Sequence, residues 1–363
     1  MTIEQKLQIV LITYNRSYFL NRTLKQLFSE ESPVKKCDIT VLDNNSADST
    51  AEIVSEYQKK FPNLQYKKNP LNIGGNANIV RAFETGAVSG KEYVWVLCDD
   101  DYYDWSNFDA VSEAMDGNVD CIGIARYAIP DNELNNPAYQ FFQLTFVPGG
   151  IYKTSVISDT VLTNMYDTIY TMFSQSCISA HILNNSGKIS FLEKPIVENG
   201  LHVQDPEEPE CDYSFFRGTE PSETSFRRKE QLWIFGFANI VRLLNDTKLQ
   251  HKCMEISVPY KDIYSSWENF FNCMGQFKGI DKIHYLYELN DVLPDEKKVD
   301  VGVGGYNKHC SVCCNEYDSE YARIFNKKAK KLALFQIFVL IIYKCTHWPI
   351  FKKYKNKRNK CRR

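Results

Sequence analysis

The sequence predicts an α/β fold whose central sheet is mainly parallel. Apolar, β-rich runs occur at residues 7–13, 39–42, 64–67 and 93–98, and they lack the spacing of an amphipathic helix. A polar turn and then a helical pattern follow each run. Strands that alternate with helices over short connections form right-handed β-α-β units, which place neighbouring strands in parallel.

The first two units share one design. The first strand is followed by the turn Tyr14-Asn15-Arg16-Ser17 and by a helix whose apolar positions recur as far as Phe28. The second strand ends in Asp43-Asn44-Asn45-Ser46, after which residues 48–50 (Asp-Ser-Thr) supply N-cap side chains for the next helix. Both strands therefore end in a polar cluster.

The third and fourth units continue this order. After the third strand, Gly74 and Gly75 allow a close backbone approach before a helix that runs past Phe83. The fourth strand reads as wholly buried, and it ends in Asp99-Asp100-Asp101. Carboxyl ends of parallel strands meet at one edge of a sheet, where open α/β sheets bind ligands, so we expect the polar clusters to converge there.

Three adjacent aspartates repel one another unless a cation or a proton offsets their charge. Mg²⁺ or Mn²⁺ is the simplest partner, because these ions take oxygen ligands from one or two carboxylates and from substrate phosphates. That interpretation indicates a site for a nucleotide diphosphate. The alternative is a solvated acidic turn that caps a helix beginning near Asn107.

Four segments at these positions resemble, in order and spacing, the motifs of family-2 glycosyltransferases with the GT-A fold, as found in bacterial O-antigen and capsule synthesis. They are Val10 to Arg16, Val41 to Ser46 with Asp48 and Thr50, Asn69 to Gly75, and Leu97 to Asp101. The resemblance covers about the first 125 residues well and the next hundred loosely.

The resemblance implies donor-binding roles for eight positions, namely Thr13, Tyr14, Asn15, Asp43, Asn44, Gly74, Asp99 and Asp100. It implies Asp101 and Asp99 as ligands of Mg²⁺ or Mn²⁺. Many members have Asp where this chain has Cys98, so which aspartate binds the metal directly stays open. Asn44 is often Asp in the family, so the nucleotide base stays open too.

The catalytic base is less clear. We expect a strand at 119–126 and a β-rich segment at 139–147, ahead of the stretch where the family carries an acidic pair. Within residues 165–176, Asp167 is the one carboxylate, and it is either the base or an N-cap. His202 follows a predicted final strand pair (188–193 and 195–198) and either closes over the diphosphate or faces solvent.

The sequence predicts three regions. They are a GT-A domain at 1–225, a mainly helical region at 226–320, and a basic tail at 321–363. The second region contains Cys310, Cys313 and Cys314, which are half of a zinc site or, as we expect, reduced thiols. The N-terminus does not read as a signal peptide, so we expect the twelve cysteines to be cytoplasmic thiols.

The tail carries its own charge. The chain has a formal net charge of −2, yet 14 Lys and Arg residues and no acidic residue follow Glu320. The apolar run at 332–343 would span about 18 Å as a helix, which is too short for a bilayer core of about 30 Å. We expect peripheral attachment to the anionic inner face of a membrane, rather than nucleic-acid binding.

Together these features predict a metal-dependent glycosyltransferase that moves a hexosyl or deoxyhexosyl group from a nucleotide-diphosphate sugar to a saccharide or lipid-linked acceptor. The resemblance implies inversion at the anomeric carbon. Two alternatives stay open. One is a nucleotidyltransferase, although the turn at 14–17 is not a glycine-rich phosphate loop. The other is a catalytically silent saccharide-binding or scaffold subunit.

Overall fold

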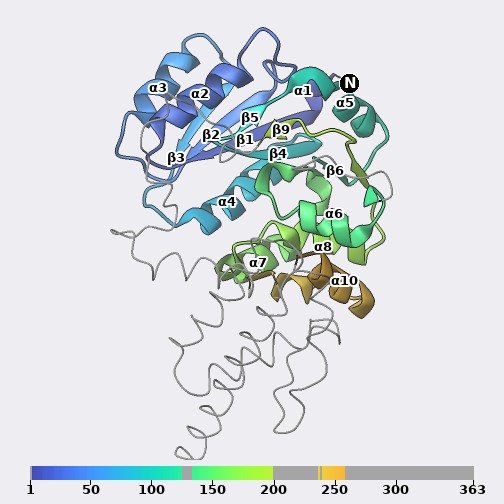
Figure 1. The fold of residues 1–363 in the computed structure, drawn as a ribbon. Coiled ribbons are helices and arrows are strands. Elements are labelled where there is room, and N and C mark those ends of the chain that lie inside the picture. Colours follow the sequence, from blue (N-terminus) through green and yellow to red (C-terminus); the bar gives the residue numbers. More distant parts are fainter. Residues whose placement is uncertain (1, 125–132, 199–235, 238, 258–363) are drawn as a thin grey trace, which may run out of the picture. The chain divides into compact units, whose positions relative to one another are not determined.

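A computed structural model describes residues 2–124, 133–198, 236–237 and 239–257, which belong to one compact unit (Figure 1). A second unit, which includes residues 258–363, lies outside the described residues. The described strands are Leu7–Thr13 (β1), Asp38–Asp43 (β2), Leu64–Lys68 (β3), Tyr93–Cys98 (β4), Tyr102–Tyr103 (β5), Cys121–Gly123 (β6), Gly150–Lys153 (β7), Ile189–Phe191 (β8) and Val197–Glu198 (β9).

The described α-helices are Ile3–Lys6 (α1), Ser17–Leu27 (α2), Thr50–Gln58 (α3), Gly75–Ala87 (α4), Asp109–Asp116 (α5), Pro137–Gln143 (α6), Asp159–Asp167 (α7), Ser176–Asn184 (α8) and Thr247–Ser257 (α10). Short 3₁₀ turns cover Trp105–Asn107 (η1), Val147–Gly149 (η3), Thr154–Val156 (η4) and Ile169–Thr171 (η5). Among the described residues, no helix combines the length and the apolar character needed to cross a membrane.

The main sheet has seven strands in the order β3-β2-β1-β4-β7-β6-β8. Strands β1 to β4 run parallel, which confirms the predicted β-α-β units, whereas β7 runs antiparallel to both β4 and β6. The fold is therefore α/β with a mainly parallel sheet, and β1 lies inside it, between β2 and β4, with every residue buried.

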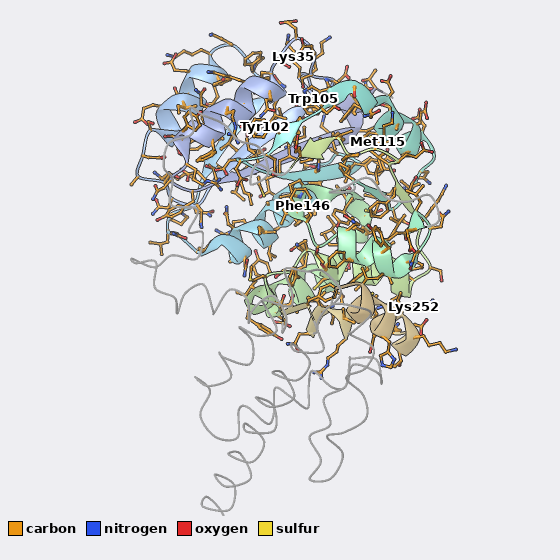
Figure 2. All side chains as sticks on the ribbon, in the orientation of Figure 1. Lys35, Tyr102, Trp105, Met115, Phe146 and Lys252 are labelled. Atoms are coloured by element: carbon orange, nitrogen blue, oxygen red, sulfur yellow. The ribbon has the colours of Figure 1, made fainter. Side chains whose placement is uncertain are left out.

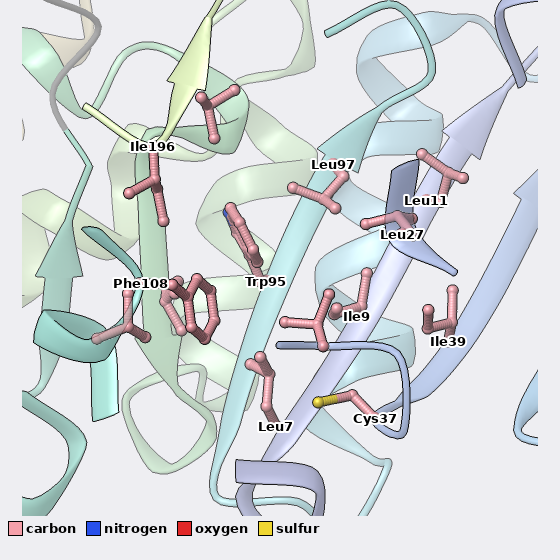
Figure 3. Packing of buried hydrophobic residues seen from close by; sticks show 14 of the residues in the cluster. Leu7, Ile9, Leu11, Leu27, Cys37, Ile39, Trp95, Leu97, Phe108 and Ile196 are labelled. Atoms are coloured by element: carbon pink, nitrogen blue, oxygen red, sulfur yellow. The ribbon is translucent and has the colours of Figure 1, made fainter. Parts of the chain in front are cut away.

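Strand β1 is buried on both faces, so alternate residues pack against different helices. Leu7, Ile9 and Leu11 share one core cluster with Leu27 of α2 (Figure 3) and with Val54 of α3. Helix α4 contacts β1 and β4 outside that cluster, from the other face of the sheet (Figure 1). Helices on both faces explain why these strands are continuous apolar runs rather than alternating ones.

The aromatic segment at 139–147 is not β-structure as expected. Residues Pro137–Gln143 form helix α6, whose N-cap Asn136 accepts a hydrogen bond from the Ala138 backbone N–H at 3.1 Å. Pro at the first helical position is pre-organised for a helix, and Ala138 and Phe141 lie buried at helical spacing. Capping and helical burial outweigh the β-propensity of the aromatic residues here.

The prediction that segments 188–193 and 195–198 form a strand pair is wrong, because the two strands belong to different sheets. Strand β8 runs parallel to β6 in the main sheet, whereas β9 pairs antiparallel with β5 in a separate two-stranded sheet. Strand β9 therefore lies against the residues that directly follow the three aspartates.

Helix α10 contacts α6, and the Phe237 ring lies 6.1 Å from the Phe141 ring and 5.9 Å from the Phe173 ring. The described part of the predicted helical region thus packs on the domain that precedes it. The three predicted domain boundaries stay predictions. His202, the thiol cluster at 310–314 and the tail at 321–363 lie outside the described residues.

Candidate active site

The strand register brings the polar clusters to one edge of the sheet. Thr13, the last residue of β1, pairs with Asp43 at the end of β2, and Ile12 pairs with Cys98 at the end of β4. The turns after these three strands therefore start side by side, at the edge where the sequence predicts the donor site.

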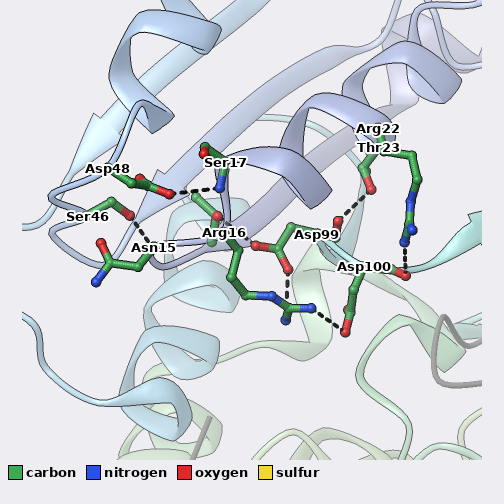
Figure 4. A network of polar contacts seen from close by, with 10 residues as sticks. Asn15, Arg16, Ser17, Arg22, Thr23, Ser46, Asp48, Asp99 and Asp100 are labelled. Carbon is green, nitrogen blue, oxygen red and sulfur yellow. Dashed lines mark hydrogen bonds and ion pairs between the residues drawn. The ribbon is translucent and has the colours of Figure 1, made fainter. Parts of the chain in front are cut away.

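Hydrogen bonds between side chains and the backbone connect the turn after β1 to the turn after β2 (Figure 4). Asn15 has a left-handed backbone with φ 51°, and its side-chain oxygen accepts from the Ala47 N–H at 2.7 Å. In return, the Asn15 N–H donates to Ser46 Oγ at 2.8 Å, and the Ser17 N–H donates to Asp48 at 2.9 Å. Asn tolerates the left-handed region better than most residues, which explains its place in this turn. Asn15 itself is exposed, and Tyr14 beside it is half-buried.

Arg16 joins the first turn to the aspartates (Figure 4). Its guanidinium lies 3.1 Å from Asp99 Oδ1 and 2.8 Å from Asp100 Oδ2. The other oxygen of Asp99 accepts a hydrogen bond from Thr13 Oγ1 at 2.7 Å. Burial raises the pKa of Asp99 to about 6, although the charge of Arg16 lowers it. Both oxygens of Asp99 are therefore engaged within the protein.

Helix α2 fixes the backbone of the aspartate turn. Thr23 Oγ1 donates to the carbonyl of Asp99 at 2.8 Å, and Arg22 donates to the carbonyl of Asp100 at 2.7 Å. Gln26 donates to the carbonyl of Asp101 at 3.2 Å. The Arg22 guanidinium also lies 4.0 Å from the ring of Tyr102, which directly follows the aspartates. Figure 2 labels Tyr102. Three successive carbonyls thus point to the helix, so the shape of the turn is set before any ligand binds.

Asp43 is wholly buried, with both carboxylate oxygens hydrogen-bonded. Oδ1 accepts from the Ser46 backbone at 2.8 Å and the Ser46 hydroxyl at 2.6 Å, and Oδ2 accepts from the Tyr66 hydroxyl at 2.6 Å. Burial and the bond to Asp43 raise the pKa of Tyr66, so Tyr66 stays a donor. Through these hydrogen bonds, the Asp43 carboxylate fixes the conformation of the second turn.

Asn44 organises the loop that leads to α4. Its amide nitrogen donates to Asn72 at 2.8 Å, and its oxygen accepts from the Asn69 side chain at 3.1 Å and the Ile73 N–H at 3.0 Å. Asn72 in turn accepts from the N–H of Gly74, whose φ of 83° suits glycine. Sequence reasoning assigned Asn44 to the nucleotide and missed this amide network. The asparagines of segment 69–78 were visible, but their meeting with Asn44 depends on tertiary structure.

One group of potential metal ligands occurs among the described residues. One donor atom each from Cys98, Asp100 and Asp101 lie within 4.8 Å of one another. Asp101 is 2% exposed, and Asp99 is not part of the group. Two carboxylates at the end of a strand fit the oxygen preference of Mg²⁺ or Mn²⁺. This group joins Asp100 with Asp101, whereas the resemblance implies Asp101 with Asp99; which aspartates bind the metal stays a prediction.

The hydroxyl of Tyr103 is a further polar group near this cluster. Its oxygen is buried, and no hydrogen-bond partner lies among the described residues. Burial raises the pKa of Tyr103, and the charges of Asp101 and Cys98 raise it further. A buried hydroxyl without a partner beside potential metal ligands is consistent with a site that an additional group completes.

Asp167 is exposed and is the last residue of α7, so it is not an N-cap. The chain continues directly into η5, where the Ile169 carbonyl accepts from Asn76 in the first turn of α4 at 2.7 Å. The neighbourhood of Asp167 is therefore tied to the same sheet edge. Whether Asp167 is the base stays a prediction.

Three consecutive polar residues, Ser174, Gln175 and Ser176, are 2% exposed or less at the start of α8. Their Ser174 Oγ, Gln175 Oε1 and Ser176 Oγ atoms lack hydrogen-bond partners among the described residues. They fall within the stretch where the sequence lacks the family's acidic pair. Sequence reasoning missed them, because a Ser-Gln-Ser run carries no signal of burial.

The sequence model of glycosyl transferase family 2 matches residues 8–180, which contain β1 to β4 and the whole of this edge. Residues 8–180 are a glycosyl transferase family 2 domain.

Relatives of this family-2 domain are glycosyltransferases by name. The chain is 23% identical over 203 residues to an uncharacterized glycosyltransferase of Mycoplasma genitalium, and the match covers 52% of this chain and 65% of that protein. It is 23% identical over 170 residues to the poly(ribitol-phosphate) beta-glucosyltransferase of Bacillus spizizenii, covering 44% of this chain and 26% of that protein. The matched stretch is thus shorter than two thirds of either relative.

Solved structures share the fold. S. aureus TarS 1-349 in complex with UDP-GlcNAc matches with a TM-score of 0.54 at 15% identity, covering 90% of each chain. The mannosyltransferase PcManGT from Pyrobaculum calidifontis, in complex with GDP-Man and Mn²⁺, matches with a TM-score of 0.50 at 13% identity, covering 78% of each chain. The fold of the family-2 domain is GT-A, as the sequence predicted.

Proposed function

We propose that this chain is a glycosyltransferase that moves a hexosyl or deoxyhexosyl group from a nucleotide-diphosphate sugar to a saccharide or lipid-linked acceptor, with inversion. The observation that supports this proposal most directly is the group of potential metal ligands formed by Cys98, Asp100 and Asp101 at the carboxyl edge of a family-2 domain. The named relatives and the nucleotide-sugar complexes of fold neighbours support the same reaction class.

In this proposal the turns at the edge hold the donor. The half-buried Tyr14 and exposed Asn15 offer the first surface to the nucleotide, and Gly74 brings the start of α4 close to the diphosphate. Asp100 and Asp101 would hold Mg²⁺ or Mn²⁺, which would supply positive charge to stabilise the departing diphosphate. Arg16 adds a fixed positive charge beside these carboxylates.

Asp167 is the proposed base that takes the proton of the acceptor hydroxyl, and His202 is the next candidate. Replacing Asp167 with Asn should leave donor binding intact and lower transfer about 10²–10⁴-fold. Asp159→Asn is the matched control, because Asp159 is also exposed but begins the same helix. Equal turnover in the two variants would move the base elsewhere.

The metal site has its own test. Asp101→Ala should abolish metal-dependent binding of the nucleotide, measured as the thermal shift that a ligand of the native state causes. Asp116→Ala, on the exposed side of α5, controls for loss of one charge. Normal donor binding by Asp101→Ala in metal would refute the site.

The acceptor and the location complete the proposal. We place the enzyme in surface polysaccharide synthesis, in the cytoplasm, with the tail at 321–363 on the anionic inner face of the membrane and without a nucleic-acid partner. Liposome co-sedimentation of the full chain and of a chain ending at residue 326 tests the attachment. Full-length protein that stays in the supernatant at low salt would exclude it.

A catalytically silent saccharide-binding subunit is the second candidate. It is favoured by the start of α8, where buried Ser174, Gln175 and Ser176 stand instead of an acidic pair. Release of nucleotide diphosphate together with a glycosylated acceptor would exclude it, whereas saccharide binding without turnover of any donor would establish it.

A further inference from the structure

Cys98 distinguishes this metal-ligand group from one made of carboxylates. It is the last residue of β4 and is only partly exposed. Its sulfur and one oxygen each from Asp100 and Asp101 are all within 4.8 Å of one another.

The separation of these three atoms suits one ion. Metal–oxygen bonds of about 2.0–2.2 Å and metal–sulfur bonds of about 2.3 Å place opposite ligands about 4.4 Å apart. The three atoms all lie within 4.8 Å of one another, so no pair is more than about 0.4 Å farther apart than that span. The turn itself does not need to move, because α2 already holds the carbonyls of Asp99, Asp100 and Asp101.

The neighbouring residues separate Asp99 from this group. Thr13 and Arg16 occupy both oxygens of Asp99, whereas Arg16 contacts Asp100 at Oδ2. The group therefore offers one sulfur and two carboxylates. The Tyr103 hydroxyl, which is buried and has no hydrogen-bond partner among the described residues, belongs to the strand that directly follows Asp101.

We propose that Cys98 is a direct ligand of the metal, together with Asp100 and Asp101, and that its sulfur makes the site prefer borderline cations such as Co²⁺ and Zn²⁺ over Mg²⁺. Thiolates favour softer ions, whereas an all-carboxylate site suits Mg²⁺ and Mn²⁺. On binding, the S–H bond breaks, a metal–sulfur bond forms, and the proton leaves to solvent. This inference rests on the proposed function for the position of the metal, and it adds the third ligand and the selectivity.

Cobalt reports sulfur ligation directly. A Co²⁺–thiolate bond gives a charge-transfer band in the near ultraviolet that oxygen ligands do not give. The starting protein is the full chain with Cys310, Cys313 and Cys314 changed to Ser, which removes the compact thiol cluster as a competing site. Co²⁺ titration of this protein, in a reductant without thiols, should produce the band.

Two variants of that protein isolate Cys98. Cys98→Ser should lose the band, and Cys98→Asp should lose it while its affinity for Co²⁺ relative to Mg²⁺, measured by competition, falls on the order of ten-fold or more. Cys177→Ser is the control, because Cys177 is a buried thiol of α8 outside the group and its loss should leave the band. Circular dichroism of each variant checks that the chain is folded.

The outcomes separate this inference from the proposed function. A starting protein that binds Co²⁺ without the band, or a Cys98→Ser variant that keeps the band, overturns Cys98 as a ligand. Sugar transfer by a protein that never shows the band overturns the ligand role alone. A band that is present in the starting protein and lost in Cys98→Ser, with no turnover of any nucleotide sugar, supports Cys98 as a ligand and overturns the proposed glycosyltransferase activity.

Discussion

Arg16 is the side chain whose removal should disturb the aspartate turn most. Its guanidinium contacts the buried Asp99 and the partly exposed Asp100, and it lies 4.6 Å from the ring of Phe19. In the Arg16→Ala variant the charged carboxylate of Asp99 stays buried and, of these two partners, keeps only the hydrogen bond from Thr13. We expect the variant to unfold more easily than the parent chain.

The size of the effect follows from the burial of each contact. Breaking a buried ion pair costs about 3–5 kcal/mol, but uptake of a proton by Asp99 limits this cost. That limit matters because the pKa of Asp99 already lies at about 6 with Arg16 present. The Asp100 contact is partly exposed and adds less than about 1 kcal/mol, and the Phe19 contact adds about 0.5–1 kcal/mol. We expect a loss of roughly 2–4 kcal/mol, a large share of a typical domain's stability.

A double-mutant cycle isolates the pair. Asp99→Asn keeps an acceptor for Thr13 but removes the charge, so the loss caused by Arg16→Ala should shrink by about 1–2 kcal/mol in that background. Arg16→Lys is the matched control, because it keeps the charge yet lacks the fork that reaches two carboxylates. Urea unfolding without metal gives each free energy. A loss below about 0.5 kcal/mol for Arg16→Ala, or strict additivity with Asp99→Asn, would refute this account of the turn.

Three further predictions concern the scaffold of the site. Asn44→Ala should cost about 1–3 kcal/mol in urea unfolding, because it removes three hydrogen bonds and leaves the buried Asn69 amide without one of its acceptors; a loss of a few tenths would contradict the network. Gly86→Ala should cost about 1–3 kcal/mol, because the new Cβ would lie 2.1 Å from a Val94 methyl carbon, whereas Gly90→Ala meets open space and adds only backbone strain. Equal losses in the two glycine variants would refute the packing argument. Partial burial raises the pKa of Asp48, but hydrogen bonds from Thr50 and Ser17 outweigh burial and lower this pKa overall. The stability that Asp48 adds should therefore be present above about pH 4 and be lost as the pH falls further. Asp48→Asn should make the free energy of unfolding depend less on pH in that acidic range.

The parallel half of the fold was readable from the sequence, because β1 and β4 are apolar without helical spacing and their helices begin at recognisable polar turns. The other half was less readable. The aromatic residues of α6 suggested a strand, yet the Asn136-Pro137 pair at its start was the better signal. Local propensity is a weak guide where helical capping and burial act together.

The sequence by itself determined which side chains reach the carboxyl edge, since Thr13 and Asp43 end buried strands and Asp99 directly follows one. Their connections had to wait for the tertiary structure. Only the three-dimensional arrangement decided that Arg16 holds Asp99 and Asp100, that Asn44 serves the loop before α4, and that Cys98 joins Asp100 and Asp101. Each of these depends on the direction of a side chain after the strand ends, where the backbone leaves the regular pleat, so strand periodicity no longer specifies which groups meet.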